Sequence, residues 1–247
     1  MRANKRAPDA LRPVKIKPDY LDFADGSAFI EIGKTRVVAS ATIEEKVPLF
    51  LKNSGTGWIT AEYSMLPRST EKRTLRERMQ TRISGRNQEI QRLIGRSLRA
   101  VTELSVLAEK TVIIDCDVIQ ADGGTRTASI TAGCIALALA LKKMLDEGVI
   151  SQMPLKHLVS GVSVGIVDGH MLLDLDYCED AKADIDMNVV ETEKGQLIEI
   201  QATAERNPFS RKELSTLLGL ADKGIKELIQ YQKDVLKKKS LLFMAYG

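Results

Sequence analysis

The sequence has few of the residues from which most metal sites and nucleophile systems are built. It contains two histidines and three cysteines in 247 residues. His157 and His170 have no second histidine at helical spacing, and no two cysteines form a CxxC pair. Zinc sites and histidine-based nucleophiles need such groups, so both classes are disfavoured and any acid–base chemistry falls to carboxylates. The odd number and wide spacing of Cys116, Cys134 and Cys178 predict reduced core residues in a cytoplasmic protein.

Long apolar runs and the common nucleotide-binding fingerprints are also lacking. No apolar run approaches the roughly 20 residues of a membrane span, and the basic start of the chain, MRANKRAPDALRP, has no apolar signal-peptide core. We therefore expect no membrane partner. Neither G-x-x-x-x-G-K-[ST] nor G-x-G-x-x-G occurs, so neither a P-loop nor a dinucleotide site is indicated.

Charge is distributed unevenly along the chain, although its net value is only +3. Between Arg68 and Arg99 there are ten basic and three acidic residues, which gives a local net charge of +7. Nine of the ten basic residues are arginines, whose planar guanidinium group suits bidentate binding of phosphates. This segment therefore predicts contact with a polyanion.

A helix is predicted within this basic segment. Residues 68–85 show no apolar period and favour a mobile loop, but from Asn87 the pattern becomes helical. One face of the expected helix collects the apolar residues Ile90, Ile94, Leu98, Val101 and Leu104. The opposite face carries Arg92, Arg96 and Arg99, which are interpreted as solvent-exposed.

The rest of the chain alternates strand and helix patterns, which predicts an α+β fold. Residues 26–45 are expected to form a β-hairpin with its turn at Gly33, and residues 159–177 a second one with its turn at Gly169. The similar layout of the two hairpins suggests two related halves within one domain. Additional strands are expected over 58–65, 111–120 and 196–204. Long helices are expected from Thr125 to a C-cap near Gly148, and from a Ser210 capping box to about Lys237.

The turn ADGGTRT connects the strand over 111–120 to the alanine-rich helix, and the rest of the chain is organised around it. Gly123 and Gly124 give a bare, flexible backbone and deliver Thr125 and Arg126 to a helix N-terminus. Unpaired N–H groups and the helix dipole favour a bound phosphate at that position, and Arg126 would add donors. The alternative is a tight strand-to-helix turn with a surface arginine, and this segment alone does not decide between them.

Acidic residues concentrate near the end of the second hairpin. Asp174 and Asp176 alternate with leucines and are interpreted as the polar face of a strand. Asp180 and Asp186 flank a short turn, so their carboxylates could converge. Such a pair could hold Mg²⁺ or keep one carboxyl group protonated, or it could serve only the solubility of a surface turn.

Many stretches of the chain together resemble a known family. They are LRPVKI, GSAFIEIG, GWITAEYSMLPR, SGRNQEIQRLIGRSLRA, IDCDVIQADGGTRTASIT, SVGIVDG, LLDLDY, DMNVV and LLGLADKGI. The chain resembles bacterial ribonuclease PH from about Asp9 to Leu236, which implies a single domain over 1–247 with the fold of that family and leaves residues 237–247 as a tail of open role. The implied activity is the phosphate-dependent 3′-to-5′ trimming of transfer RNA precursors and other RNAs such as ribosomal RNA. The resemblance thus implies an enzyme, a phosphate-dependent tRNA nucleotidyltransferase.

The resemblance also implies roles for individual residues. Inorganic phosphate would be bound by Arg86, Gly124, Thr125 and Arg126. The catalytic carboxylates, which are also candidate Mg²⁺ ligands, would be Asp180 and Asp186. RNA would be contacted by Arg68, Arg73 and Arg76. The implied assembly is a homohexamer, a trimer of dimers. A non-catalytic RNA-binding ring subunit is the alternative, and it predicts loss of the phosphate arginine or of the carboxylates, all of which are present.

Overall fold

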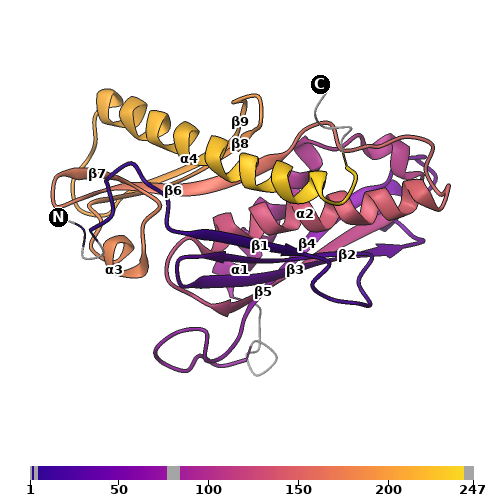
Figure 1. Ribbon diagram of the computed structural model, residues 1–247, viewed down its shortest axis with the longest axis horizontal. Coiled ribbons are helices and arrows are strands. Elements are labelled where there is room, and N and C mark those ends of the chain that lie inside the picture. The colour runs from indigo at the N-terminus through magenta and orange to yellow at the C-terminus, as the bar shows by residue number, and fades with distance from the viewer. Residues whose placement is uncertain (1, 3–4, 77–83, 242–247) are drawn as a thin grey trace.

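The computed structural model describes residues 2, 5–76 and 84–241. Within these residues the strands form a five-stranded sheet and a four-stranded sheet, which lie side by side along the long axis of the molecule (Figure 1). The two sheets and the long helices contribute to one continuous cluster of buried apolar side chains. The single domain over 1–247 that the sequence predicts stays a prediction.

The first sheet has the order β1-β2-β3-β5-β4. Its strands are β1 (Val14–Pro18), β2 (Gly26–Ile32), β3 (Thr35–Glu44), β4 (Trp58–Met65) and β5 (Thr111–Gln120). The β2–β3 hairpin turns at Gly33, whose φ is +59°, as the sequence predicted. Strands β4 and β5 are parallel, so their C-terminal ends meet at one edge, where the segment to α2 begins.

The second sheet has the order β7-β6-β8-β9 and is antiparallel throughout. Its strands are β6 (Val159–Val167), β7 (His170–Leu173), β8 (Ile185–Thr192) and β9 (Leu197–Ala204). The hairpin prediction over 159–177 was too long, because β7 ends at Leu173. Asp174 has φ +54°, which breaks the strand, and the chain then forms the short helix α3 (Tyr177–Asp180).

Helix α2 (Thr125–Asp146) is the central element of the core, as Figure 1 shows. It contacts strands of both sheets as well as α1 and α4. By length and composition α2 could span a membrane, so the expectation that no apolar run reaches that length was wrong. However, 83% of its most apolar window is buried inside the protein, and the core helix of a soluble protein has the same character. Gly148, with φ +71°, follows the helix in the predicted C-cap region.

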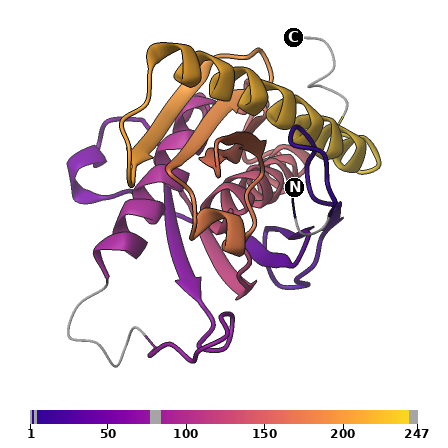
Figure 2. The ribbon, with the colours of Figure 1, turned by 90° about the vertical axis from the view of Figure 1, so that its left-hand side faces the viewer.

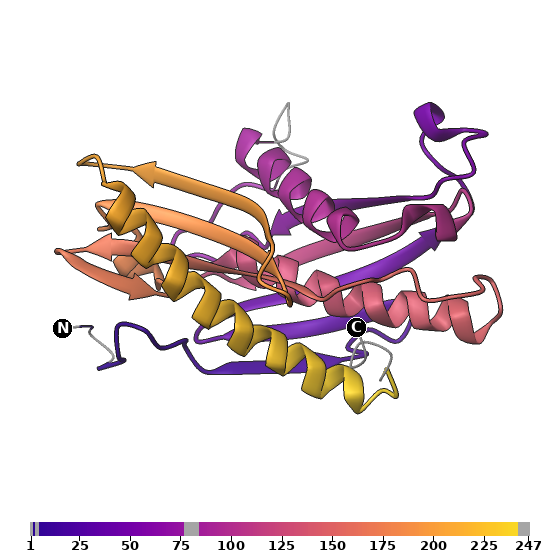
Figure 3. The same cartoon turned by 90° about the horizontal axis from the view of Figure 1, so that it is seen from above.

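Two more helices cover the sheets. Helix α1 (Gly85–Ala100) packs along the edge strand β4, and α4 (Arg211–Lys237) crosses the four-stranded sheet toward α2 (Figure 3). The predicted capping box is present at the start of α4, where Ser210 accepts from the backbone of Glu213. Leu104 is not part of the predicted apolar face of α1, because the helix ends at Ala100 and Leu104 begins the 3-10 helix η3 (Leu104–Leu107).

Two interpretations of individual side chains need correction. Cys116 and Cys134 are buried free thiols as predicted, but Cys178 is exposed on α3. Arg99 is not simply solvated, since its guanidinium lies 4.3 Å from the Trp58 ring centroid and donates to the backbone oxygen of Ile59. Arg92 and Arg96 are exposed, and Arg96 pairs with Glu199 at 2.5 Å.

The segment after β4 projects from one end of the five-stranded sheet (Figure 2). Residues 68–76 of the predicted mobile loop are without a helix or strand, whereas Gly85 already belongs to α1. Arg78 and Arg82, which contributed to the predicted basic footprint, lie outside the described residues.

Candidate active site

The Gly-Gly turn starts α2 as the sequence predicted. Gly124 is the N-cap and has φ +65°, and Gly123 has φ +78°, a conformation that glycine adopts without steric cost. No side chain of the described residues caps this end of the helix by a hydrogen bond. The first backbone N–H groups of α2 therefore face the cavity described below and are available to an anion.

Thr125 is fixed from the neighbouring strand. The hydroxyl groups of Tyr63 on β4 and Thr125 are 2.8 Å apart and hydrogen-bonded, and both residues are buried. Burial raises the pKa of Tyr63, so the phenol keeps its proton at neutral pH. Sequence reasoning missed Tyr63, because nothing in the alternation of β4 distinguishes it from the other buried side chains.

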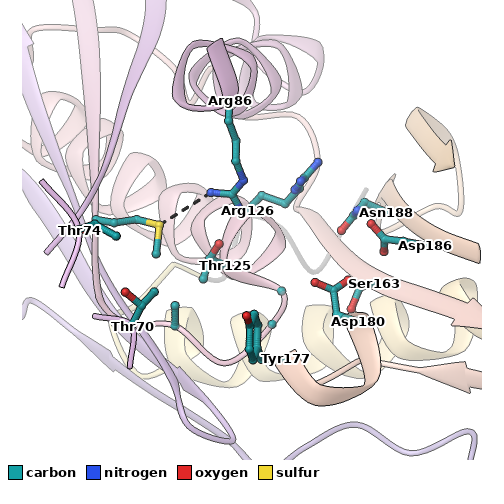
Figure 4. A pocket seen from close by; sticks show the side chains of 14 residues that line it. Thr70, Thr74, Arg86, Thr125, Arg126, Ser163, Tyr177, Asp180, Asp186 and Asn188 are labelled. Carbon is teal, nitrogen blue, oxygen red and sulfur yellow. Dashed lines mark hydrogen bonds between the residues drawn. The ribbon is translucent and has the colours of Figure 1, made fainter. Parts of the chain in front are cut away.

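Arg86 and Arg126 come from different helices but border the same space (Figure 4). Arg86 lies in the first turn of α1, whose N-cap is Ser84, and Arg126 lies in the first turn of α2. Arg126 donates to Gln201 on β9 at 2.8 Å and lies 3.7 Å from the carboxylate of Glu89. Gln201 is a further neighbour of the site that the sequence did not reveal.

The two carboxylates that the sequence singled out also border this space. Asp180 is the last residue of α3 and not part of an inter-strand turn, while Asp186 lies near the start of β8. Partial burial raises the pKa of Asp180, and the positive charges of Arg126 and Arg86 oppose this rise. Burial, followed by repulsion from Asp180, raises the pKa of Asp186 to about 6. The larger perturbation therefore falls on Asp186.

These groups surround a cavity of about 280 Å³. In Figure 4, Arg86 and Arg126 lie at the top, Thr125 lies below them, and Asp180, Asp186 and Asn188 lie on the right. Tyr177 lies at the margin and is 59% exposed. Opposite charges thus face each other across a space large enough for a phosphate and a ribose, which suits a reaction in which an anion attacks and an oxygen leaves.

Asp174 and Asp176 do not form the polar face of a strand, so that interpretation was wrong. Asp176 is the N-cap of α3 and accepts from Glu179 N at 3.0 Å. Asp174 is 3% exposed and is ion-paired with Arg12 at 2.7 Å and Arg6 at 3.0 Å. The alternation with leucines was misleading because the chain leaves the strand at Asp174.

The three arginines expected to contact RNA lie outside the cavity. Arg68, Arg73 and Arg76 are all exposed on the segment that follows β4. Thr70 and Thr74 of the same segment line the cavity, so this segment connects the basic surface with the cavity.

Comparison with known proteins places the chain in a family. The description "3′ exoribonuclease family, domain 1" matches residues 10–143, and domain 2 of that family matches residues 157–224. Ribonuclease PH of Moorella thermoacetica is 58% identical over 236 residues, covering 96% of this chain and 94% of that protein. This chain belongs to the ribonuclease PH family. Ribonuclease PH of Syntrophomonas wolfei is 57% identical over 235 residues, covering 95% of this chain and 98% of its own length.

Solved structures confirm the ribonuclease PH fold and its α+β class. Rice (Oryza sativa) Rrp46 aligns with a TM-score of 0.75 at 22% identity and covers 95% of this chain and 100% of its own. A chain of the Archaeoglobus fulgidus exosome with RNA bound to the active site aligns with a TM-score of 0.77 at 22% identity, covering 93% and 92%. At such identity the likeness concerns the fold alone.

Proposed function

We propose that this ribonuclease PH family member is a phosphorolytic 3′-to-5′ exoribonuclease that trims the 3′ ends of transfer RNA precursors and other RNAs such as ribosomal RNA. The observation that carries the proposal is the cavity in which Arg86, Arg126 and the N-terminus of α2 face Asp180 and Asp186. An anion-binding side opposite an acidic side is what attack by inorganic phosphate on a phosphodiester requires.

Inorganic phosphate is the nucleophile in this proposal. It is held by Arg86, Arg126, Thr125 and the backbone of Gly124, and one of its oxygens attacks the phosphorus of the last 3′,5′ linkage. The bond from that phosphorus to the ribose 3′ oxygen breaks, so that a nucleoside diphosphate is released and the RNA is one nucleotide shorter. The guanidinium groups offset the repulsion between two anions and stabilise the transition-state charge. The reverse reaction adds a nucleotide.

The leaving 3′ oxygen needs a proton, and the carboxylate pair can supply it. An ordinary aspartate has a pKa of about 3.9 and is almost fully ionised at neutral pH. The pKa of Asp186 is raised to about 6, so about a tenth of the molecules hold this proton at pH 7. The charge of Asp180 is the second cause of the raised pKa of Asp186. We therefore assign the proton to the pair, with Asp186 as its main holder.

Asp180 and Asp186 also fit the alternative role of Mg²⁺ ligands. The Oδ1 atom of Asp186 is buried and has no hydrogen-bond partner among the described residues, which suits a ligand to a hard cation. Two carboxylates leave room for the waters and phosphate oxygens that Mg²⁺ prefers. Bound Mg²⁺ would neutralise charge on the reacting phosphates.

The remaining parts of the proposal concern RNA and assembly. The exposed Arg68, Arg73 and Arg76 guide the RNA strand toward the cavity through its phosphates. The chain forms a homohexamer, a trimer of dimers, in the cytoplasm. Exposed apolar side chains support burial between subunits, since Leu49 is 89% exposed and Phe50 is 70% exposed.

The decisive experiment is to incubate the protein with RNA carrying a few extra 3′ nucleotides, Mg²⁺ and varied phosphate. The expected products are nucleoside diphosphates, formed at a rate that rises with phosphate. Nucleoside monophosphates, or a rate indifferent to phosphate, would show hydrolysis by activated water instead. Arg126→Ala should abolish turnover and leave RNA binding largely intact. If the wild-type protein binds RNA without any turnover, the role of a non-catalytic ring subunit replaces this proposal.

A further inference from the structure

We propose that Arg12 is a positioning residue of the active site, which holds the phosphate-binding turn at a fixed distance from the segment that carries Asp180. This inference rests on the proposed phosphate site at residues 124–126. It starts from a buried guanidinium that connects the phosphate-binding turn with the stretch of chain that leads to α3.

One side of the bridge is Asp174. Its carboxylate accepts from the Arg12 backbone N at 2.7 Å, from Nε at 2.9 Å and from Nη2 at 2.7 Å. Burial acts to raise the pKa of Asp174, but the charge and hydrogen bonds of Arg12 outweigh it and the pKa lies below its usual value. The carboxylate is therefore ionised at neutral pH, and a bidentate charged pair of this kind is rigid as well as strong.

The other side of the bridge is the turn itself. Arg12 Nη1 donates to the backbone oxygen of Asp122, and Nη2 donates to that of Gly123 at 3.3 Å. Thr35 holds the same turn from β3, because its hydroxyl donates to Gly123 O at 2.6 Å and accepts from Asp122 N at 3.1 Å. Turn carbonyls held this way keep the following N–H groups of α2 directed into the cavity.

The fold leaves room for this bridge and continues it to the carboxylate. Arg12 is 4% exposed, and a Cβ atom at Gly33 would lie 2.6 Å from its side chain, so the hairpin glycine makes space for it. From Asp174 the chain runs through Asp176, the N-cap of α3, to Asp180 at the end of that helix. One guanidinium thus fixes the phosphate turn relative to the first residues of the acidic side.

Arg2 provides a matched control within the same buried cluster. It is 8% exposed and pairs with Glu179 at 2.6 Å. Its other side-chain hydrogen bonds to described residues go to the backbone oxygens of Leu173 and Asp174 and to those of Ala7 and Pro8 in the N-terminal arm, the segment before β1. Arg2 therefore anchors the arm on the acidic side without a described hydrogen bond to the turn. A purely structural role of the cluster predicts equal effects at Arg2 and Arg12, whereas the bridge predicts different ones.

The test compares Arg12→Lys, Arg2→Lys and Thr35→Val in the full-length protein. A lysine keeps the charge but cannot reach the carboxylate and both carbonyls at once. The readouts are thermal unfolding, the dissociation constant for inorganic phosphate alone by calorimetry, and the KM for phosphate with RNA in excess. In metal sites, loss of the groups that orient the ligands costs about 10- to 100-fold in affinity or activity, and we take the lower end of that range for this phosphate site. We expect Arg12→Lys to raise both phosphate constants by about that factor, Thr35→Val to raise them less, and Arg2→Lys to leave them within about twofold.

The outcomes separate the inference from the proposed function. If phosphate does not bind to the wild-type protein and does not affect its reaction rate, the measurements on the wild type alone overturn the proposed function. If the wild type binds phosphate and Arg126→Ala does not, but Arg12→Lys binds it normally, the inference alone is overturned. Should Arg12→Lys fail to fold, Thr35→Val decides, because unchanged phosphate constants in that variant also overturn the inference.

Discussion

Replacing Gly123 by alanine tests how tightly the phosphate turn is packed against the acidic side of the cavity. Gly123 has φ +78°, and a Cβ atom there would lie 2.4 Å from the backbone oxygen of Leu175 and 2.8 Å from the carbonyl carbon of Asp176. Both neighbours are backbone atoms, so the clash cannot be relieved by a rotamer change. Either the turn or the segment that leads to α3 must move.

Gly148→Ala is the matched control. Gly148 has φ +71°, follows the other end of α2 and has nothing within 4 Å of an added Cβ. Both variants carry the cost of a left-handed alanine, about 1 kcal/mol. Only Gly123→Ala adds overpacking, which costs about 1–3 kcal/mol. At about 2–4 °C per kcal/mol for a chain of this size, we expect the control to lose roughly 3 °C in Tm and Gly123→Ala roughly two to four times as much.

The assay pairs thermal unfolding with steady-state kinetics at varied phosphate. If the turn moves, Gly123→Ala should raise the KM for phosphate by about 10-fold, and if α3 moves instead, kcat should fall. Gly148→Ala should change neither, because it lies outside the cavity lining. Equal losses of Tm in the two variants, with normal kinetics in both, would refute the close contact between the turn and 175–176.

Three further predictions follow from charges in the structure. The pKa of Asp186 is about 6, so protons should compete with Mg²⁺ for this carboxylate. Mg²⁺ affinity measured without RNA should therefore weaken by up to about tenfold for each pH unit below that value. An affinity that stays unchanged between about pH 7.5 and 5.5 would contradict Mg²⁺ binding by Asp186. Joint replacement of Arg68, Arg73 and Arg76 by alanine should reduce the slope of log affinity for single-stranded RNA against log salt by about 2, while Arg92→Ala, on the exposed face of α1, should leave it unchanged. Asp174 has a lowered pKa in the folded protein, so its contribution to the free energy of unfolding is present above the unfolded-state pKa of about 3.9 and is lost as the pH falls toward the folded-state pKa. Asp174→Asn should therefore be less stable than the wild type in urea titrations at pH 7. A stability difference that stays constant down to about pH 3 would count against the ion pair.

Local pattern accounts for much of the fold. Strand β4 and strand β5 have the bounds that the sequence predicts, and the helix from Thr125 does begin at the Gly-Gly turn. These elements depend on alternation, glycine conformation and capping, which act over a few residues. The errors at Leu104 and after Leu173 arose where an apolar pattern continued past the end of the element that it described.

By itself, the sequence determined the chemistry that the site has available. It singled out a phosphate-binding turn, an arginine-rich segment and a carboxylate pair, and the resemblance of its motifs assigned roles to them. Only the tertiary structure decided that Arg86, Arg126, Asp180 and Asp186 border one cavity, and that Arg12 lies between the turn and Asp174. Arg12 and Asp174 are 162 positions apart. Their pairing depends on how the segment before β1 lies against the end of β7, where Leu173 N donates to Pro8 O, and no local periodicity encodes that arrangement.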